Sequence, residues 1–435
     1  MLDRAADIAV VSAAATRLYR RGIAAERPLD AIVSTFIKDD LKGTPRPLRG
    51  EVARLAQAMW RRRRLLEAID LALSTGAGGK GGLGRHREAT AFATLVLQAR
   101  EEGRPTPALP LATPERDALV RVVDDVVKRS PIDVRASLPT WLCERLVQQG
   151  GEALALASTG TPPQTLRVNT LKTTRDALLA TLRQQGLKVR PCERSPIGIV
   201  TDGRADIFRT PAFFDGTFEM QDEGSQLVAL HAAAQPGERV VDGCAGAGGK
   251  TLAMAAQMAG TGTIVALDIH GGRLKALQER ARRAGAHNVR AIDLEESGKI
   301  LKRLKGSSDL VLVDAPCTGT GVLRRNPDTG WRLQPEDVER LTVLQRSLLD
   351  TYAPLVRPGG RMVYATCSLL AEENDGAITH FLASHPDFAL EAQPLSLNPA
   401  DTAPGGHWDG FFAATLRRAA PSGTASKTTT LPVAD

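Results

Sequence analysis

The chain has 435 residues, which is too long for one ordinary domain, and 43% of them are hydrophobic, enough for more than one core. The charged fraction of 24% is ordinary for a globular protein, and no apolar run approaches the ~18 residues that a membrane helix needs. The net charge is +7, and the five cysteines and seven histidines show no metal-binding spacing. We therefore expect a cytoplasmic protein with no membrane contact, no structural disulfide and no metal site.

Residues 1–135 are predicted to form a helical domain. Apolar residues recur every three to four positions in RPLRGEVARLAQAMWRRRRLLEAIDLAL, as they do on the buried face of a helix. The residues expected to face its core are Val52, Leu55, Met59, Leu66 and Ile69. The glycine-rich segment at 76–84 has no strand before it, so it is predicted to be a flexible connection and not a phosphate-binding loop.

The excess positive charge lies in this first domain. Residues 1–135 hold 24 Lys and Arg against 17 Asp and Glu, whereas residues 136–435 hold 32 of each. A basic module beside a neutral one favours nucleic acid as the partner, although a solvated charged surface would give the same counts. The four arginines at 61–64 have the same two interpretations, a phosphate contact or a solvated helix face.

Two further modules and a tail are predicted. Residues 136–235 read as a small α/β module, with strands at 164–172 and 197–203 and a helix that ends at Gly186. Residues 236–420 alternate near-continuous apolar strands with helices, which predicts a parallel sheet covered on both faces. Residues 421–435 are predicted to be disordered.

The first strand of this sheet leads into a glycine-rich turn, DGCAGAGGKT at 242–251. Ligands of such sheets bind beyond the carboxyl ends of the strands, where glycines allow close approach of the backbone. A P-loop would need glycine in place of Cys244, and a dinucleotide site would need glycine in place of Thr251. An S-adenosylmethionine site fits better, because Asp268 and Asp293 end the next two strands and could bind the ribose and the adenine end. Each aspartate could instead be a helix N-cap.

Two cysteines follow the fourth and fifth strands, Cys317 in VDAPCTGTG and Cys367 in YATCS. Carbon C5 of a pyrimidine has no lone pair, so it accepts a methyl group only after a thiolate has added to C6. This chemistry also needs a polar group near N3 of the ring, and Asp314 is available beside Cys317. Free cysteines are also common core residues. We assign Cys143 and Cys192 to that role, whereas two cysteines at neighbouring strand ends favour catalysis.

These motifs resemble the RNA 5-methylcytosine methyltransferases of the RsmB type, the Fmu/Sun proteins. The resemblance extends from 137 to 418 and includes PPQTLRVNTLK, MQDEGSQLV, RRNPD and the two cysteine motifs. It implies a Rossmann-like domain that uses S-adenosylmethionine to methylate C5 of a cytosine in RNA. It implies that Cys367 is the nucleophile, that Cys317 assists product release, and that Asp314 contacts the cytosine close to the methyl donor. The cofactor residues that it implies are Cys244, Ala245, Gly246, Ala247, Gly248, Gly249, Lys250, Asp268, Asp293 and Asp314.

The N-terminal helices resemble the NusB-like RNA-binding domain that precedes this core in bacterial RsmB proteins. That resemblance implies 16S rRNA as the substrate, and we expect the protein to act as a monomer. Other hypotheses keep the chemistry and change the target to tRNA, 23S rRNA or DNA. In DNA cytosine methylases the nucleophile follows the fourth strand, which would make Cys317 the nucleophile. A further hypothesis is a non-catalytic RNA-binding factor with an inactive methylase domain.

Overall fold

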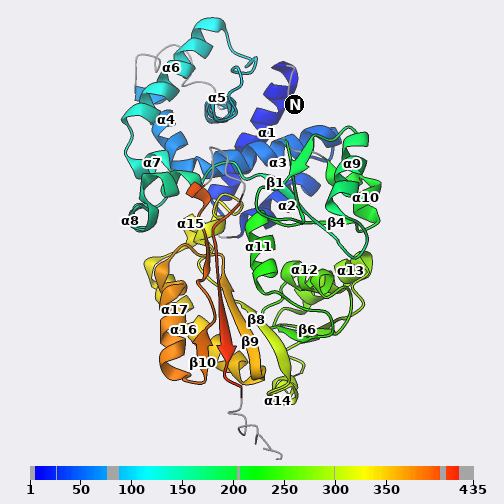
Figure 1. Ribbon diagram of the computed structural model, residues 1–435. Coiled ribbons are helices and arrows are strands. Elements are labelled where there is room, and N and C mark those ends of the chain that lie inside the picture. Colours follow the sequence, from blue (N-terminus) through cyan, green and yellow to red (C-terminus); the bar gives the residue numbers. More distant parts are fainter. Residues whose placement is uncertain are drawn as a thin grey trace, which may run out of the picture.

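The computed structural model describes residues 5–25, 27–75, 88–202, 206–297, 299–401 and 408–420. The predicted flexible connection at 76–84 and the predicted disordered tail at 421–435 lie outside the described residues. Figure 1 shows a group of helices at one end of the molecule and a large α/β part at the other, with a small sheet beside them. In the part of the chain that the structure describes, no helix combines the length and apolarity needed to cross a bilayer.

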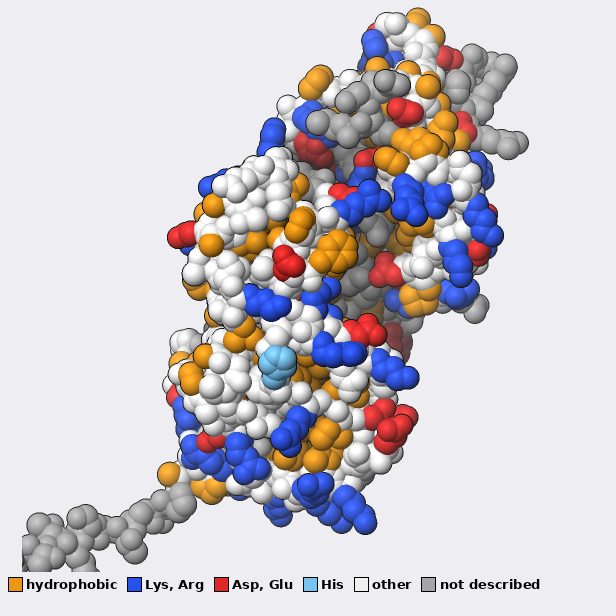
Figure 2. Space-filling model, turned by 90° about the vertical axis from the view of Figure 1, so that its right-hand side faces the viewer, with side chains coloured by type: hydrophobic (Ala, Val, Ile, Leu, Met, Phe, Trp, Pro, Cys, Tyr) orange, Lys and Arg blue, Asp and Glu red, His pale blue; other side chains and the backbone are white. Residues whose placement is uncertain are grey.

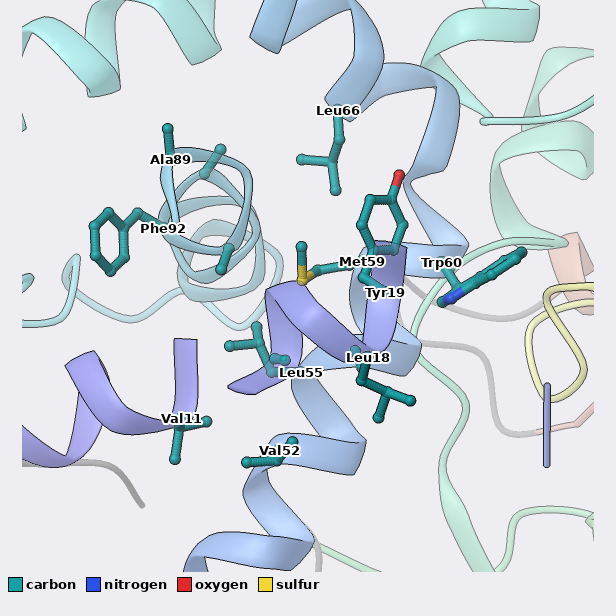
Figure 3. Close-up of a cluster of buried hydrophobic side chains, with 14 of the residues drawn as sticks. Val11, Leu18, Tyr19, Val52, Leu55, Met59, Trp60, Leu66, Ala89 and Phe92 are labelled. Atoms are coloured by element: carbon teal, nitrogen blue, oxygen red, sulfur yellow. The ribbon is translucent and has the colours of Figure 1, made fainter. Parts of the chain in front are cut away.

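The N-terminal helices share one core. They are α1 (Ala5–Ile23), α2 (Leu29–Asp39), α3 (Arg46–Arg61), α4 (Arg63–Thr75), α5 (Ala89–Glu101) and α6 (Thr113–Arg129). Figure 3 shows Val11 and Leu18 of α1 facing Val52 and Leu55 of α3. All five predicted core residues are buried. The single helix expected over 46–73 is broken at Arg62, whose backbone leaves the helical region (φ −114°, ψ 19°).

A small antiparallel sheet follows two connecting helices, α7 (Ile132–Arg135) and α8 (Thr140–Ala157). Its strands are β1 (Gln164–Val168), β2 (Val189–Pro191), β3 (Gly198–Thr201) and β4 (Phe218–Met220), in the order β2-β3-β1-β4. Helices α9 (Arg175–Gln184) and α10 (Pro211–Phe214) contribute to its core, and α11 (Glu223–His231) leads to the large sheet.

The large sheet has the order β10-β12-β9-β8-β5-β6-β7, with β11 paired to β12. Five strands are parallel: β5 (Arg239–Asp242), β6 (Thr263–Asp268), β7 (Val289–Asp293), β8 (Ser308–Asp314) and β9 (Val356–Thr366). The others are β10 (Phe388–Leu390), β11 (Leu395–Leu397) and β12 (Phe411–Arg418). Strand β12 is antiparallel to β9, so the sheet is mixed and not purely parallel as the sequence predicted.

Alternate residues of the parallel strands enter two different cores. Val240 and Leu312 belong to the core on one face, whereas Val241 and Val311 belong to the core on the other. The helices between the strands are α12 (Gly249–Gln257), α13 (Gly271–Ala284), α14 (Ile300–Leu304), α15 (Thr329–Arg332), α16 (Pro335–Tyr352) and α17 (Asp375–Ser384). Burial on both faces is why these strands read as continuous apolar runs. The predicted architecture, a helical N-terminal region followed by a small α/β module and a Rossmann-like domain, is confirmed.

The strand order changes direction at β5, which lies between β6 and β8. Ligands of open α/β sheets bind at this point, beyond the carboxyl ends of the strands. In Figure 1, β12 points away from the N-terminal helices, so β8 and β9 point toward them. The ligand-binding edge of the large sheet therefore faces the rest of the protein.

Candidate functional site

The glycine-rich turn after β5 is fastened to strand β6. The backbone N–H of Gly246 donates to Oδ2 of Asp268 (2.7 Å), and the N–H of Ala245 donates to the carbonyl oxygen of Leu267 (2.9 Å). Gly248 has a left-handed backbone (φ +83°), and a Cβ there would lie 2.6 Å from Cγ of Leu277. This position therefore requires glycine for both its conformation and its packing.

Asp268 and Asp293 are direct neighbours across β6 and β7, at the carboxyl end of each strand. Each also accepts a backbone hydrogen bond two residues on, Asp268 from His270 N (2.8 Å) and Asp293 from Glu295 N (2.9 Å). A carboxylate oxygen has more than one acceptor site, so these bonds leave capacity for ligand hydroxyls. A Cβ at Gly271 would lie 2.8 Å from Oδ2 of Asp293, so the glycine gives this carboxylate its room. The turn and the two acids fit the ribose and adenine of S-adenosylmethionine.

Lys250 links the glycine-rich turn to the loop that carries Cys317. Its Nζ lies 2.6 Å from Oδ2 of Asp314, the last residue of β8, and the Lys250 side chain is 10% exposed and that of Asp314 29%. Burial by itself lowers the pKa of Lys250, but the Asp314 carboxylate and its hydrogen bond more than compensate and raise it. The sequence assigned Lys250 to the cofactor. In the structure its ammonium group pairs with Asp314, which the sequence also assigned to the cofactor, so the two side chains offer one donor and one acceptor side by side.

The two predicted cysteines lie next to each other. Their sulfur atoms are 3.3 Å apart, within hydrogen-bond distance for thiols. Cys317 lies in the first cysteine loop (315–321), and Cys367 lies in the second (367–370). The N–H of Ala315 donates to the carbonyl oxygen of Ala365 in β9 (2.9 Å), which ties the first loop to this strand. The N–H of Gly321 donates to the carbonyl oxygen of Cys367 (2.9 Å), which joins the two loops directly. The hydrogen bond with Cys367, together with burial, raises the pKa of Cys317 well above its usual value, which keeps this thiol protonated.

The remaining cysteines lie apart from this pair. Cys143 and Cys192 are buried, as expected for core residues. Cys244 is partly buried in the turn, and burial raises the pKa of its thiol beyond the range of a reactive cysteine.

Two acidic residues of the site were missed by the sequence analysis. Asp242 ends β5 as Asp268, Asp293 and Asp314 end their strands, and this shared position was a signal that could have found it. Its Oδ2 accepts a hydrogen bond from the hydroxyl of Thr251 (2.6 Å), and burial raises its pKa to about 7. The other residue is Glu373, a buried glutamate that binds both cysteine loops. Its signal was the polar run Glu-Glu-Asn at 372–374, which follows the end of β9 and the second cysteine loop.

The arginines at 61–64 do not form the solvated helix face that was one of their two predicted roles. Arg61 and Arg62 are buried, and Arg62 pairs with Glu101. Arg63 lies 4.6 Å from the ring centre of Trp331, and Arg64 pairs with Asp133 (2.9 Å) and donates to the carbonyl oxygen of Leu138 (3.0 Å). After the α3–α4 break at Arg62, the side chains of Arg63 and Arg64 contact later parts of the chain. The run is a joint between the N-terminal helices and the rest of the chain.

A second joint lies beside the cysteine loops. Arg325 pairs with Asp222 at the start of α11 (2.6 Å) and with Asp409 before β12, and it donates to the carbonyl oxygen of Pro163 (3.1 Å). Arg324 also pairs with the fully buried Asp409. Because Asp222 and Pro163 flank the small sheet, this network fixes that sheet at the edge where the cysteines lie.

Figure 2 shows one face of the molecule, on which many Lys and Arg side chains and some Asp and Glu side chains lie around a recess between its parts. Such a surface favours a polyanionic ligand.

Comparison with known proteins agrees with this geometry. The family model of 16S rRNA methyltransferases RsmB/F matches residues 229–417, and that of the ferredoxin-like domain of RsmF/B-like methyltransferases matches residues 138–207. A ribosomal RNA small subunit methyltransferase B from Pseudomonas putida is 37% identical over 313 residues, which cover 68% of this chain and 70% of that protein.

Two crystal structures are similar over most of their own length. PH0851 is 26% identical with a TM-score of 0.71, and the match covers 94% of this chain and 98% of that one. A methyltransferase homolog protein from Pyrococcus horikoshii is 26% identical with a TM-score of 0.57, covering 66% of this chain and 97% of that one.

Proposed function

Because the chain belongs to the RsmB/F family of small-subunit ribosomal RNA methyltransferases, we propose that it methylates C5 of a cytosine in 16S rRNA through a covalent adduct with Cys367. Membership of this family confirms the resemblance drawn from the sequence motifs. It makes the chain a methyltransferase that acts on ribosomal RNA and uses S-adenosylmethionine. The atom that is methylated and the covalent step are our proposal, and the observation that carries it is the pair of thiols 3.3 Å apart at the ligand edge.

The chemistry explains why two thiols are useful. S-adenosylmethionine supplies an electrophilic methyl group when it is bound. The thiolate of Cys367 adds to C6 of the cytosine, which makes C5 a carbon nucleophile that can take this methyl group. A base then removes the C5 proton, the electrons of the C–H bond restore the C5–C6 double bond, and the Cys367 sulfur leaves with the electrons of the C6–S bond. The protonated thiol of Cys317, in hydrogen-bond contact with Cys367, stabilises the departing sulfur.

The Lys250–Asp314 pair is proposed to recognise the cytosine. The exocyclic amine of cytosine donates hydrogen bonds, and the Asp314 carboxylate can accept one. The Lys250 ammonium can donate to N3 of the ring, which withdraws electrons and helps the thiolate to add to C6. Uracil carries a carbonyl oxygen in place of the amine, so it would place that oxygen against the carboxylate. We therefore expect discrimination against uracil at this site.

We assign RNA binding in part to the N-terminal helices. The exposed arginines Arg17, Arg20 and Arg21 lie on one face of α1, and the first 135 residues carry the whole net charge of +7. The NusB-like role of these helices, the cytoplasmic location and the monomeric state remain expectations. The hypothesis of an inactive RNA-binding factor is disfavoured by the strand-end acids and the paired thiols, which serve no purpose in RNA binding alone.

The test is transfer of a tritiated methyl group from S-adenosylmethionine to purified RNA. We expect incorporation into 16S rRNA, sensitivity to ribonuclease, and a single 5-methylcytosine located by bisulfite sequencing. Matched reactions with 23S rRNA and tRNA are the controls. Incorporation into 23S rRNA alone or tRNA alone would assign a different RNA substrate and leave the proposed chemistry unchanged. Incorporation at a base nitrogen or a ribose oxygen would contradict the covalent mechanism.

A further inference from the structure

One buried carboxylate holds both cysteine loops. Glu373 lies in the short 3-10 helix η5 (Ala371–Glu373), just after the second loop, and is fully buried. Its Oε1 accepts hydrogen bonds from the backbone N–H of Thr318 (2.9 Å) and from Nε2 of Gln345 (2.9 Å). Its Oε2 accepts from the hydroxyls of Thr318 and Ser368. The residue directly after each cysteine therefore donates to the same side chain.

The arrangement extends to the residues on either side. Gln345, fully buried on α16, also donates to the carbonyl oxygen of Pro316 (3.0 Å), the residue before Cys317. The hydroxyl of Tyr364, in β9, donates to the backbone oxygen of Glu373 (2.6 Å). Glu373 is thus fixed to the strand that precedes Cys367, while its carboxylate and Gln345 together hold the first cysteine loop.

The partners of this carboxylate are neutral groups. A buried carboxylate is costly unless hydrogen bonds replace the water that it loses. Here four donors fill both oxygens, and a nonpolar side chain would leave the backbone N–H of Thr318 and one of the two N–H groups of the Gln345 amide without an acceptor. A glutamine has nearly the same shape. Its oxygen can accept from these two groups, while its NH₂ can donate to the hydroxyls of Thr318 and Ser368, which can rotate to accept.

We propose that Glu373 is a positioning residue that keeps Cys317 and Cys367 within reach of each other. It acts on the sulfur atoms through Thr318 and Ser368, and it thereby sets the rate of any step that needs both thiols. Its effect on turnover rests on the proposed function. Its effect on the distance between the thiols does not, because that distance is a property of the protein alone.

The first experiment measures the thiols without any RNA. Dibromobimane becomes fluorescent when it bridges two neighbouring thiols, and the wild-type full-length protein should be bridged at Cys317 and Cys367. Cys317→Ser, which cannot be bridged there, sets the background. In Glu373→Ala the bridging rate should fall by about 10-fold or more because the loops are no longer held together, whereas Glu373→Gln should restore most of it.

The matched control is Glu372→Ala. Glu372 is the preceding residue in the same 3-10 helix, but its side chain is 41% exposed and pairs with Arg145 at the surface. This variant should bridge at the wild-type rate. Calorimetry should show that Glu373→Ala, Glu373→Gln and Glu372→Ala bind S-adenosylmethionine with a Kd within about 2-fold of the wild-type value, because the cofactor turn does not depend on Glu373.

The second experiment measures turnover. If Glu373 positions the thiols, Glu373→Ala should lower kcat by about 100-fold and leave the KM for RNA nearly unchanged, and Glu373→Gln should recover most of the loss. A wild-type bridging rate in Glu373→Ala would overturn the proposal, as would equal loss in Glu373→Ala and Glu372→Ala. If Glu373→Ala does not fold, Ser368→Ala takes its place, since it removes one donor from one loop. A bridging rate unchanged in Ser368→Ala would then overturn it.

The two proposals can fail separately. Bridging that depends on Glu373 in an enzyme that forms no RNA adduct would leave the positioning role intact and refute the covalent mechanism. An enzyme that forms the adduct but whose thiols are bridged equally well without Glu373 would support the covalent mechanism and refute the positioning role.

Discussion

The sulfur atoms of Cys317 and Cys367 lie 3.3 Å apart, although 50 positions separate the two residues in the chain. Strands β8 and β9 are neighbours in the sheet, and each cysteine follows the carboxyl end of one of them. The chain connection between these strands is long, because it includes α15 and α16. The parallel pairing of the two strands brings their carboxyl ends, and with them the two cysteine loops, side by side.

This contact leads to opposite expectations for the two cysteines. Cys367→Ala should form no covalent complex with substrate RNA and should be inactive, because it lacks the proposed nucleophile. Cys317→Ala should still attack C6 but release the product slowly, and it should accumulate a protein–RNA complex that survives denaturing electrophoresis. A complex trapped only by Cys367→Ala would assign the nucleophile to Cys317, as in the DNA methylases. Absence of the complex in both variants would leave the adduct unsupported.

Asp268 should contribute strongly to cofactor affinity. Asp268→Ala removes hydrogen-bond acceptors for a ribose and loosens the turn at Gly246, so the Kd for S-adenosylmethionine should rise by about 10-fold or more. Isothermal titration calorimetry measures this directly. Glu279→Ala, an exposed position on α13 after the same strand, should bind as wild type. Equal affinity in Asp268→Ala and wild type would remove Asp268 from the site.

Asp242 should make stability depend on pH. Its pKa is raised from 3.8 to about 7 by burial, so between these values the folded protein holds a proton that the unfolded chain has lost. This protonation stabilises the folded protein fully below the pKa of Asp242 in the unfolded chain. The stabilisation is lost as the pH rises through the pKa of Asp242 in the folded protein, and each unit of difference between the two pKa values corresponds to about 1.4 kcal/mol. Asn cannot titrate at this position. The free energy of unfolding of Asp242→Asn, measured by urea denaturation, should therefore fall less between pH 5 and pH 8 than that of the wild-type protein.

Asp337→Asn is the control for this measurement. A backbone hydrogen bond from Gln334 and a side-chain bond from Arg340 lower the pKa of Asp337, so this carboxyl titrates below the window. Its variant should keep the wild-type slope. A wild-type slope in Asp242→Asn would show that this buried carboxyl does not titrate between pH 5 and pH 8.

The exposed arginines of α1 should contribute to RNA affinity by neutralising phosphates. In the double variant Arg17→Gln and Arg20→Gln, RNA binding should weaken, and the slope of log K against log salt should flatten by about 0.7 for each phosphate that is no longer neutralised. Filter binding at several salt concentrations measures both quantities. Lys302→Gln with Arg303→Gln removes the same charge from α14, at the opposite end of the molecule from α1 (Figure 1), and should leave the slope unchanged. Equal flattening in both pairs would show a general charge effect and not a specific role of α1.

The strand-end residues could be predicted because they depend on local order alone. A run of apolar residues that ends in Asp or Cys places that side chain at the ligand edge, whatever the helices between the strands do. Asp268, Asp293, Asp314 and Cys367 were found in this way. The mixed pairing was missed because β12 enters the sheet antiparallel at β9, and its sequence, FFAATLRR, reads like the parallel strands.

The joints and supports could not be predicted, since they depend on contacts between distant segments. Four consecutive arginines suggest a charged surface, and only the packing of α4 against α7 and Trp331 shows that they face inward. Glu373 is likewise an ordinary surface residue type, and its burial follows from the meeting of two loops and α16.

The joint at 61–64 limits how far this protein can be treated as a set of interchangeable parts. Arg63 and Arg64 belong to α4, but their partners lie after α6 in the chain, Asp133 in α7 and Trp331 in α15. A hybrid in which residues 1–130 come from a relative would therefore have one residue of each contact from the relative and the other from this chain. We expect such hybrids to hold together only when the acceptor supplies an aromatic residue at 331 and an acid at 133, so these two positions have to be exchanged along with the helices.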